Sequence, residues 1–141
     1  MKIMPAKKNL NPQFSIGELA TQTECQIQTI RYYEQISILP QPARTQGGHR
    51  TYSLEHVERL RFVRRSRELG FSLEAVRELL RLADMRENDC AAVDRVASQH
   101  LADVHEKIVQ LRSLERELKR MVTRCGRGKI ADCQIIQSLS H

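Results

Sequence analysis

The sequence contains no tryptophan and few other aromatic residues, three tyrosines and three phenylalanines among 141 residues. This composition predicts a modest core built from aliphatic side chains. No apolar run approaches the roughly 18 residues that a membrane-spanning helix needs. Pro5, Lys7 and Lys8 also interrupt the start of the chain, where a secretory signal would have its apolar stretch. We therefore expect a cytoplasmic protein without membrane contact.

Acidic residues are fewer than basic ones, 17 Asp and Glu against 23 Lys and Arg, which gives a net charge of +6. A basic chain favours a polyanionic partner. The positive charge is concentrated in one segment, because residues 44–67 contain seven arginines and only two glutamates. We therefore expect the surface for such a partner in the N-terminal half; the alternative is a solvated basic helix.

Capping and periodicity predict a mainly helical fold that begins with a helix-turn-helix. Ser15 is a plausible N-cap, and Glu18 three positions later completes a capping box. After a break at residues 22–25, apolar residues at helical spacing predict a second short helix over about residues 26–36. Two short helices joined by a tight turn are typical of a DNA-binding helix-turn-helix.

The next segment predicts a hairpin followed by two more helices. Residues 43–52 can form a hairpin that turns at Gly47 and Gly48. Ser53 then caps a third helix that ends at Gly70, and periodic leucine and valine residues predict a fourth helix that reaches Leu82.

The last helix is expected over residues 91–124 and carries a near-heptad apolar stripe. The stripe consists of Val93, Ala97, Leu101, Val104, Ile108, Leu111, Leu114, Leu118 and Met121. It is longer than a small N-terminal domain could cover, so we expect it to pack against another long helix.

Three cysteines lie at the two ends of this helix, Cys90 at one end and the pair Cys125 and Cys133 at the other. At about 1.5 Å of rise per residue, a continuous helix would separate Cys90 from Cys125 by roughly 50 Å. If the three thiols share one site, a second copy of the chain must run antiparallel and bring its Cys90 to this pair. The spacing therefore predicts a homodimer with a thiolate site at each end.

Four cysteines in a reducing cytoplasm favour metal binding or redox chemistry over a disulfide framework. Thiolates hold soft ions such as zinc, cadmium, lead, mercury and copper(I), whereas magnesium and calcium prefer oxygen ligands. Three thiolates with a divalent ion carry a net charge of −1, as do two thiolates with a monovalent ion. A third ligand at Cys90 therefore favours a divalent ion over copper(I).

The thiols and the histidines have alternative roles. A redox switch would join Cys125 and Cys133 in a disulfide, whereas a thiolate enzyme is disfavoured because no His and carboxylate pair accompanies any cysteine in local sequence. We expect Cys25 to be a small buried side chain. His100 and His105 are expected to be ordinary polar residues; supporting a metal ligand is the alternative for both, and His141 is an alternative extra ligand.

Five ordered motifs closely resemble the MerR family of bacterial transcription regulators. They are F-S-I-G-E-L-A (14–20), T-I-R-Y-Y-E (29–34), L-P-Q-P-A-R (39–44), G-G-H-R-T-Y (47–52) and L-G-F-S-L (69–73). The resemblance extends essentially over residues 14–139. It implies a winged helix-turn-helix domain, an antiparallel coiled-coil dimer and an effector site at the dimer interface. The antiparallel dimer agrees with the arrangement inferred from cysteine spacing.

Residues 1–13 are polar, aperiodic and interrupted by prolines, so we expect a flexible arm there. The resemblance implies a division of the rest into a winged helix-turn-helix domain (14–84), a linker and dimerisation helix (85–124), and a metal-binding loop with a short terminal helix (125–141). The implied DNA contacts are Arg31, Tyr33, Arg44, His49, Arg50, Tyr52, Arg64 and Arg67. His49 stands where an aromatic residue or Asn is usual, and the alternative for Tyr33 is a place in the core.

The implied metal ligands are Cys90, Cys125 and Cys133. Copper(I) sensors of the family usually have Ser at the position of Cys90, whereas lead and cadmium sensors also carry a cysteine like Cys25. The sequence A-D-C-Q-I-I near Cys133 resembles a copper-sensing loop, so copper(I) stays the alternative to zinc, cadmium, lead or mercury. In such regulators the metal-bound dimer distorts promoter DNA so that RNA polymerase can use it, and detoxification or efflux genes are activated.

Overall fold

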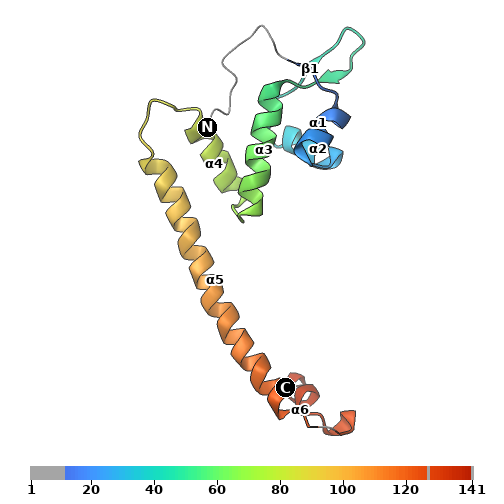
Figure 1. The fold of residues 1–141 in the computed structure, drawn as a ribbon, viewed down its shortest axis with the longest axis vertical. Coiled ribbons are helices and arrows are strands. Elements are labelled where there is room, and N and C mark those ends of the chain that lie inside the picture. The colour runs from blue at the N-terminus through green and yellow to red at the C-terminus, as the bar shows by residue number, and fades with distance from the viewer. Residues whose placement is uncertain (1–11, 127, 141) are drawn as a thin grey trace. The chain divides into compact units, whose positions relative to one another are not determined.

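The computed structural model describes residues 12–126 and 128–140 (Figure 1). The predicted arm at 1–13 lies outside the described residues except for Pro12 and Gln13, and so does His141. The chain forms two compact units, of which the first ends at Val96 and the second begins at Ala97. Among the described residues, no helix is both long enough and apolar enough to cross a membrane.

The predicted helix-turn-helix is confirmed as helices α1 (Ile16–Thr23) and α2 (Ile27–Gln35). The capping box of α1 is complete, because the Ser15 N–H donates to Glu18 Oε1 at 3.0 Å and the Glu18 N–H donates to Ser15 Oγ at 3.1 Å. These two bonds satisfy donors that the first turn of a helix leaves unpaired. The local sequence therefore defines where α1 begins.

The predicted hairpin is confirmed as strands β1 (Ala43–Arg44) and β2 (Arg50–Thr51), which pair antiparallel with Ala43 opposite Thr51. Gly48 in the turn has φ +81°, a conformation that glycine adopts without steric cost. Directly after β2, Tyr52 exchanges two backbone hydrogen bonds of 2.8 Å with Phe14. The hairpin is thereby anchored to the segment that precedes α1.

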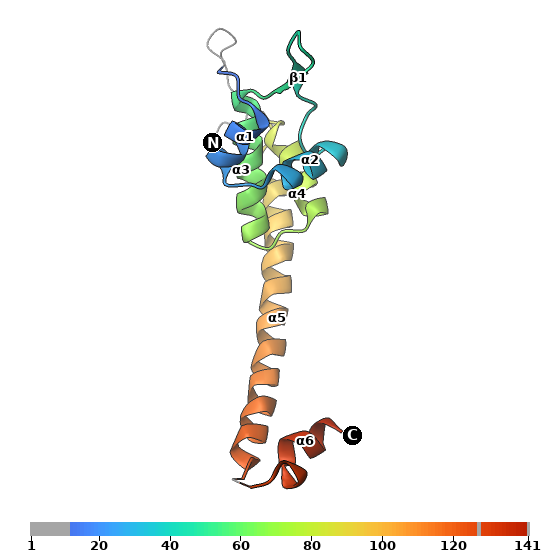
Figure 2. The ribbon, with the colours of Figure 1, turned by 90° about the vertical axis from the view of Figure 1, so that its right-hand side faces the viewer.

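Helices α3 (Leu54–Glu68) and α4 (Leu73–Ala83) follow in the first unit (Figure 2). Helix α3 packs against both α1 and α4. The core between the elements is mostly aliphatic, as the composition predicted. Its buried members are Leu19, Ile30, Tyr33, Ile38, Leu39, Tyr52, Val57, Leu60, Val63, Val76 and Leu80.

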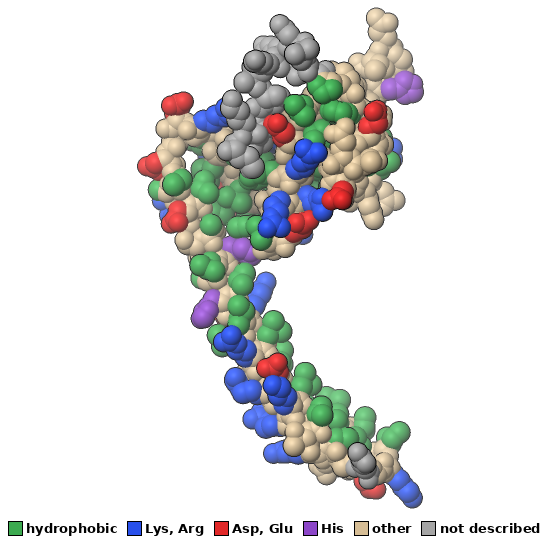
Figure 3. Space-filling view, viewed as in Figure 1, with side chains coloured by type: hydrophobic (Ala, Val, Ile, Leu, Met, Phe, Trp, Pro, Cys, Tyr) green, Lys and Arg blue, Asp and Glu red, His purple; other side chains and the backbone are tan. Residues whose placement is uncertain are grey.

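Helix α5 (Ala91–Arg124) has the predicted bounds and is followed by the short 3₁₀ helix η1 (Ile130–Asp132) and by helix α6 (Gln134–Leu139). No residue of α5 is buried within the single chain. Its apolar stripe faces solvent (Figure 3), with Leu101 69% and Leu111 63% exposed. Within the described chain this stripe is therefore left uncovered.

Candidate functional site

Helix α2 presents different side chains to solvent and to the core. Arg31 and Tyr32 are exposed, whereas Tyr33 is only 9% exposed and belongs to the core. Of the two roles considered for Tyr33, the structure supports the core role. Arg31 is therefore the predicted DNA contact of α2 whose side chain is available to a partner.

The hairpin carries a group of exposed polar side chains on a rigid turn. The Arg44 guanidinium donates to the carbonyl of Gly48 at 2.9 Å, and the His49 N–H donates to Thr45 Oγ1 at 3.2 Å. Arg50 is exposed and lies 3.9 Å from the Glu34 carboxylate. The three predicted wing contacts Arg44, His49 and Arg50 therefore lie at the surface, with the turn fixed beneath them.

Tyr52, a further predicted DNA contact, has no exposed surface. Its hydroxyl donates to Glu34 Oε1 at 2.6 Å, and burial together with this carboxylate raises the pKa of the phenol. The structure therefore does not support a DNA contact by Tyr52. It shows instead that Tyr52 links the end of the hairpin to α2, because Glu34 belongs to that helix.

Glu34 is a buried residue that links α2 to the hairpin, and the sequence interpretation gave it no role. Its side chain is buried and is shared between Tyr52 and Arg50. The available signal was its position four residues after Ile30, which places both on one face of α2. A carboxylate on a buried face requires a donor, but nothing in local sequence indicates that the donor lies 18 residues away.

Replacement of Tyr52 with phenylalanine is expected to lower the free energy of unfolding by about 1–3 kcal/mol, because the buried Glu34 carboxylate loses its donor. Urea denaturation at one fixed protein concentration measures this loss. The exposed neighbour Tyr32→Phe is the matched control and should leave the midpoint unchanged. Equal midpoints for Y52F and the wild-type protein would show that the bond contributes no net stability.

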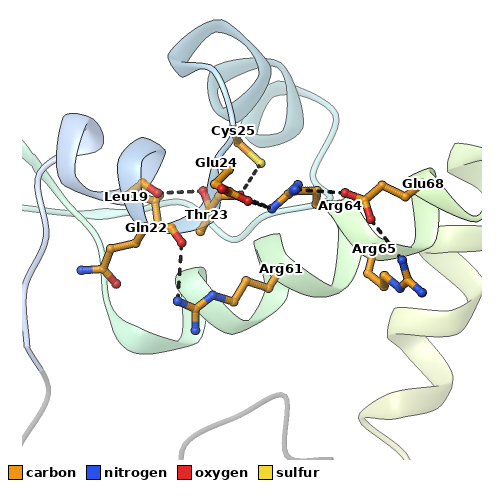
Figure 4. Close-up of polar contacts among 9 residues, drawn as sticks. All are labelled: Leu19, Gln22, Thr23, Glu24, Cys25, Arg61, Arg64, Arg65 and Glu68. Atoms are coloured by element: carbon orange, nitrogen blue, oxygen red, sulfur yellow. Dashed lines mark hydrogen bonds and ion pairs between the residues drawn. The ribbon is translucent and has the colours of Figure 1, made fainter.

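The two predicted arginine contacts on α3 differ in their surroundings, and Figure 4 shows those of Arg64. Arg67 is exposed, and its guanidinium donates to the carbonyl of Phe71 at 2.8 Å. The Arg64 guanidinium instead lies 2.6 Å from the Glu24 carboxylate and 3.1 Å from that of Glu68. Arg67 is thus open to a DNA phosphate, whereas Arg64 is already held by two carboxylates.

Cys25 is half-buried beside the core, and its thiol donates to the carbonyl of Thr23 at 3.5 Å. Burial raises the pKa of the Cys25 thiol. A protonated thiol is a poor metal ligand. The surroundings of Cys25 therefore support the small buried side chain that the sequence predicted.

Cys125 and Cys133 come together in the segment that joins α5 to α6, with their Sγ atoms 4.0 Å apart. The N–H groups of Ile136 and Ile135 face the Cys133 sulfur and lower the pKa of its thiol. The hydrogen bond with Cys133 raises the pKa of the Cys125 thiol. Cys133 therefore loses its proton before Cys125 does.

Cys90 is exposed and directly precedes the first residue of α5, whereas Cys125 directly follows its last residue. On the same helix, His100 is partly buried and His105 is exposed. Within the described part of one chain, no three Cys, His, Asp or Glu side chains form a cluster that could hold a metal ion. One chain thus brings together two of the three predicted ligands.

Two family descriptions match the chain: "MerR HTH family regulatory protein" over residues 14–83 and "MerR, DNA binding" over residues 57–121. The mercuric resistance operon regulatory protein of Bacillus cereus is 39% identical over 128 residues, which cover 90% of this chain and 97% of that relative.

Two solved structures with bound metals are also similar. The transcription regulator PbrR691 from Ralstonia metallidurans CH34, in complex with lead(II), is 40% identical with a TM-score of 0.79 over 89% of this chain and 98% of its own. The regulator MerR from Bacillus megaterium MB1, in complex with mercury(II), is 34% identical with a TM-score of 0.68 over 91% of this chain and 100% of its own.

Proposed function

Because the chain belongs to the MerR family, whose members are DNA-binding transcription regulators and not enzymes, we propose that it is a metal-responsive regulator. It binds promoter DNA as a homodimer and activates metal efflux or detoxification genes when a soft divalent ion binds. The observation that carries this proposal is the pair of thiols, Cys125 and Cys133, 4.0 Å apart.

The separation of the two sulfurs suits a shared metal ion. With metal–sulfur bonds of about 2.3 Å, two thiolates lie about 3.8 Å apart in tetrahedral geometry, about 4.0 Å in trigonal geometry and about 4.6 Å in linear geometry. The observed 4.0 Å places both sulfurs within reach of one ion, which can take a further ligand. Cys90 of a second chain is the ligand that we propose, which makes three thiolates and favours a divalent ion.

The relatives support the same class of ion. One is named for mercuric resistance, and two similar structures contain lead(II) and mercury(II). Zinc and cadmium bind the same kind of thiolate ligand. Copper(I) is the second candidate, because the loop sequence around Cys133 resembles that of copper sensors.

The exposed stripe of α5 supports a dimer. Leu111, Leu114, Leu118 and Val122 line an apolar groove on the helix surface. A second α5 would cover these side chains and remove them from water, which is the main source of stability in paired helices. An antiparallel pair would also place Cys90 of one chain at the thiol pair of the other.

We propose that Arg31 reads bases in the major groove and that Arg44, His49, Arg50 and Arg67 contact the DNA from the wing and from α3. Basic side chains that neutralise phosphates release counterions and so contribute affinity. Contacts with the edges of the bases distinguish one DNA sequence from another. Metal binding would favour a dimer that distorts the promoter for RNA polymerase. DNA deformation costs a few kcal/mol, which is within the range of coupling energies between two sites on a protein.

The proposed function is tested by titrating the purified dimer with mercury(II), lead(II), cadmium(II), zinc(II) and copper(I) in the presence of competing chelators. We expect tight binding of a divalent ion, a thiolate-to-metal charge-transfer band and a stoichiometry of two ions per dimer. Tight binding of copper(I) alone would select the second candidate. Binding of none of the five ions, with promoter activity that responds to peroxide, would favour the redox switch.

Replacement of Arg31 with alanine is expected to reduce sequence discrimination by about 1–3 kcal/mol, the usual contribution of an arginine that reads a base. The measurement compares binding to a duplex selected by the wild-type protein from a random library with binding to a scrambled duplex. Arg65→Ala removes the same charge from an exposed position on α3 and should leave the ratio unchanged. An unchanged ratio in R31A would remove Arg31 from base recognition.

A further inference from the structure

The turn between α1 and α2 is held by two arginines that reach it from α3 (Figure 4). Helix α1 has no basic residue in its last turn, and the last carbonyls of a helix need donors from outside it. Arg61 donates to the carbonyl of Gln22 at 3.5 Å, and Arg64 donates to the carbonyl of Thr23 at 3.3 Å. Residues about 40 positions downstream in the chain thus complete the end of α1.

Glu24, the next residue of the turn, adopts a left-handed conformation with φ +54°. Residues with a side chain rarely adopt this conformation unless their surroundings impose it. The Glu24 N–H donates to the carbonyl of Ala20, and its carboxylate accepts from the Arg64 guanidinium at 2.6 Å. Because Glu24 sets the direction in which the chain leaves α1, its conformation also sets the direction of α2.

The Arg64 guanidinium is held on its other side by Glu68, at 3.1 Å. Its planar fork thus contacts the carbonyl of Thr23 and the carboxylates of Glu24 and Glu68 together. A guanidinium can bind several acceptors in fixed directions, whereas a lysine ammonium on a flexible stem cannot reproduce that geometry. This arrangement depends on the shape of the arginine as well as on its charge.

We infer that Arg64 is a positioning residue that sets the orientation of α2, and with it the sequence discrimination of the protein, instead of contacting a DNA phosphate. The inference rests on the proposed function in one respect, that α2 reads the DNA. It revises the role that the family resemblance implies for Arg64. It also assigns a function to Glu24 and Glu68, two acidic residues beside a surface that binds a polyanion.

The charge-conserving variant Arg64→Lys separates the two roles in the full-length dimer. The probes are a duplex selected by the wild-type protein from a random library and a scrambled duplex of the same composition, each titrated with salt. We expect R64K to reduce the affinity ratio of the two duplexes about tenfold without changing the salt dependence. Glu24→Gln should reduce the ratio as well. The double variant should reduce the ratio no further than the more severe single variant does, because both substitutions disrupt the same contact between Arg64 and Glu24. Arg81→Lys, at an exposed position on α4 whose ion pair with Glu78 is separate from this turn, is the matched control.

A phosphate contact would give the opposite pattern. R64K would then retain the wild-type ratio, and Arg64→Gln would weaken both duplexes equally and reduce the slope of log affinity against log salt by about 0.9. That outcome would overturn the inference.

Hydrogen exchange without DNA provides a second readout that does not depend on the proposed function. Faster exchange at the amides of residues 23–26 in R64K, with protection retained in α3 and α4, would show that Arg64 holds the turn in a folded protein. Unchanged exchange at these amides would overturn the inference even if DNA binding changed. If the wild-type protein does not discriminate between the duplexes, the proposed function fails, while the exchange measurement still decides whether Arg64 holds the turn.

Discussion

Replacing Cys133 with serine is expected to abolish the metal response while leaving DNA binding by the metal-free protein intact. Serine keeps the size of the side chain but supplies a neutral hydroxyl, which is a poor ligand for a soft ion. Cys90→Ser should have the same effect if Cys90 is the third ligand. Neither thiol lies in the elements from α1 to α4 that carry the proposed DNA contacts.

Mixed dimers show whether one site uses ligands from two chains. One heterodimer pairs a Cys90→Ser chain with a chain that carries Cys125→Ser and Cys133→Ser. If Cys90 serves the opposite chain, this heterodimer retains one complete set of three thiols, because its intact Cys90 and its intact pair lie on different chains. If each site used ligands of one chain only, neither chain would hold a complete set.

The matched control pairs a wild-type chain with a chain in which all three of these cysteines are serine. It has the same number of these thiols as the first heterodimer, but in the proposed arrangement no site is complete. We therefore expect one high-affinity ion in the first heterodimer and none in the control, measured by equilibrium dialysis against a chelator. The reverse result would show that each site belongs to a single chain.

The second large effect is expected from Leu111→Lys, which should dissociate the dimer. Leu111 is 63% exposed in the single chain, so lysine there costs little until a partner covers it. In the dimer each lysine would be buried without an opposite charge, at a cost of about 3–5 kcal/mol, and symmetry would place two in every dimer.

Sedimentation analysis over a range of protein concentrations measures the change in dimerisation. Ser113→Lys adds the same charge to an exposed position of α5 outside the stripe and should leave the dimer intact. An equally tight dimer in L111K would show that the stripe is not the dimer contact. Loss of helix content together with dissociation would agree with a helix whose stability depends on its partner.

Local signals predicted most of the secondary structure. The Ser15 and Glu18 capping box, the glycines of the hairpin and the apolar spacing along α5 each involve residues a few positions apart, and the structure confirms all three. The proximity of Cys125 and Cys133 could be predicted for the same reason, because only seven residues separate them. Where the interacting groups are near in sequence, the chain cannot bring them together in many ways, so spacing is informative.

The roles of Tyr52, Glu34 and Arg64 could not be read from spacing. The sequence interpretation took Tyr52 and Arg64 as DNA contacts from the family resemblance, and it gave Glu34 no role. Their partners lie 18 and 40 residues away along the chain. Packing of α3 against α1 brings Arg64 to Glu24, and the hairpin returns Tyr52 to α2. A polar side chain becomes buried or remains exposed only when such distant elements meet, because burial and ion pairing depend on position in space and not on order in the sequence.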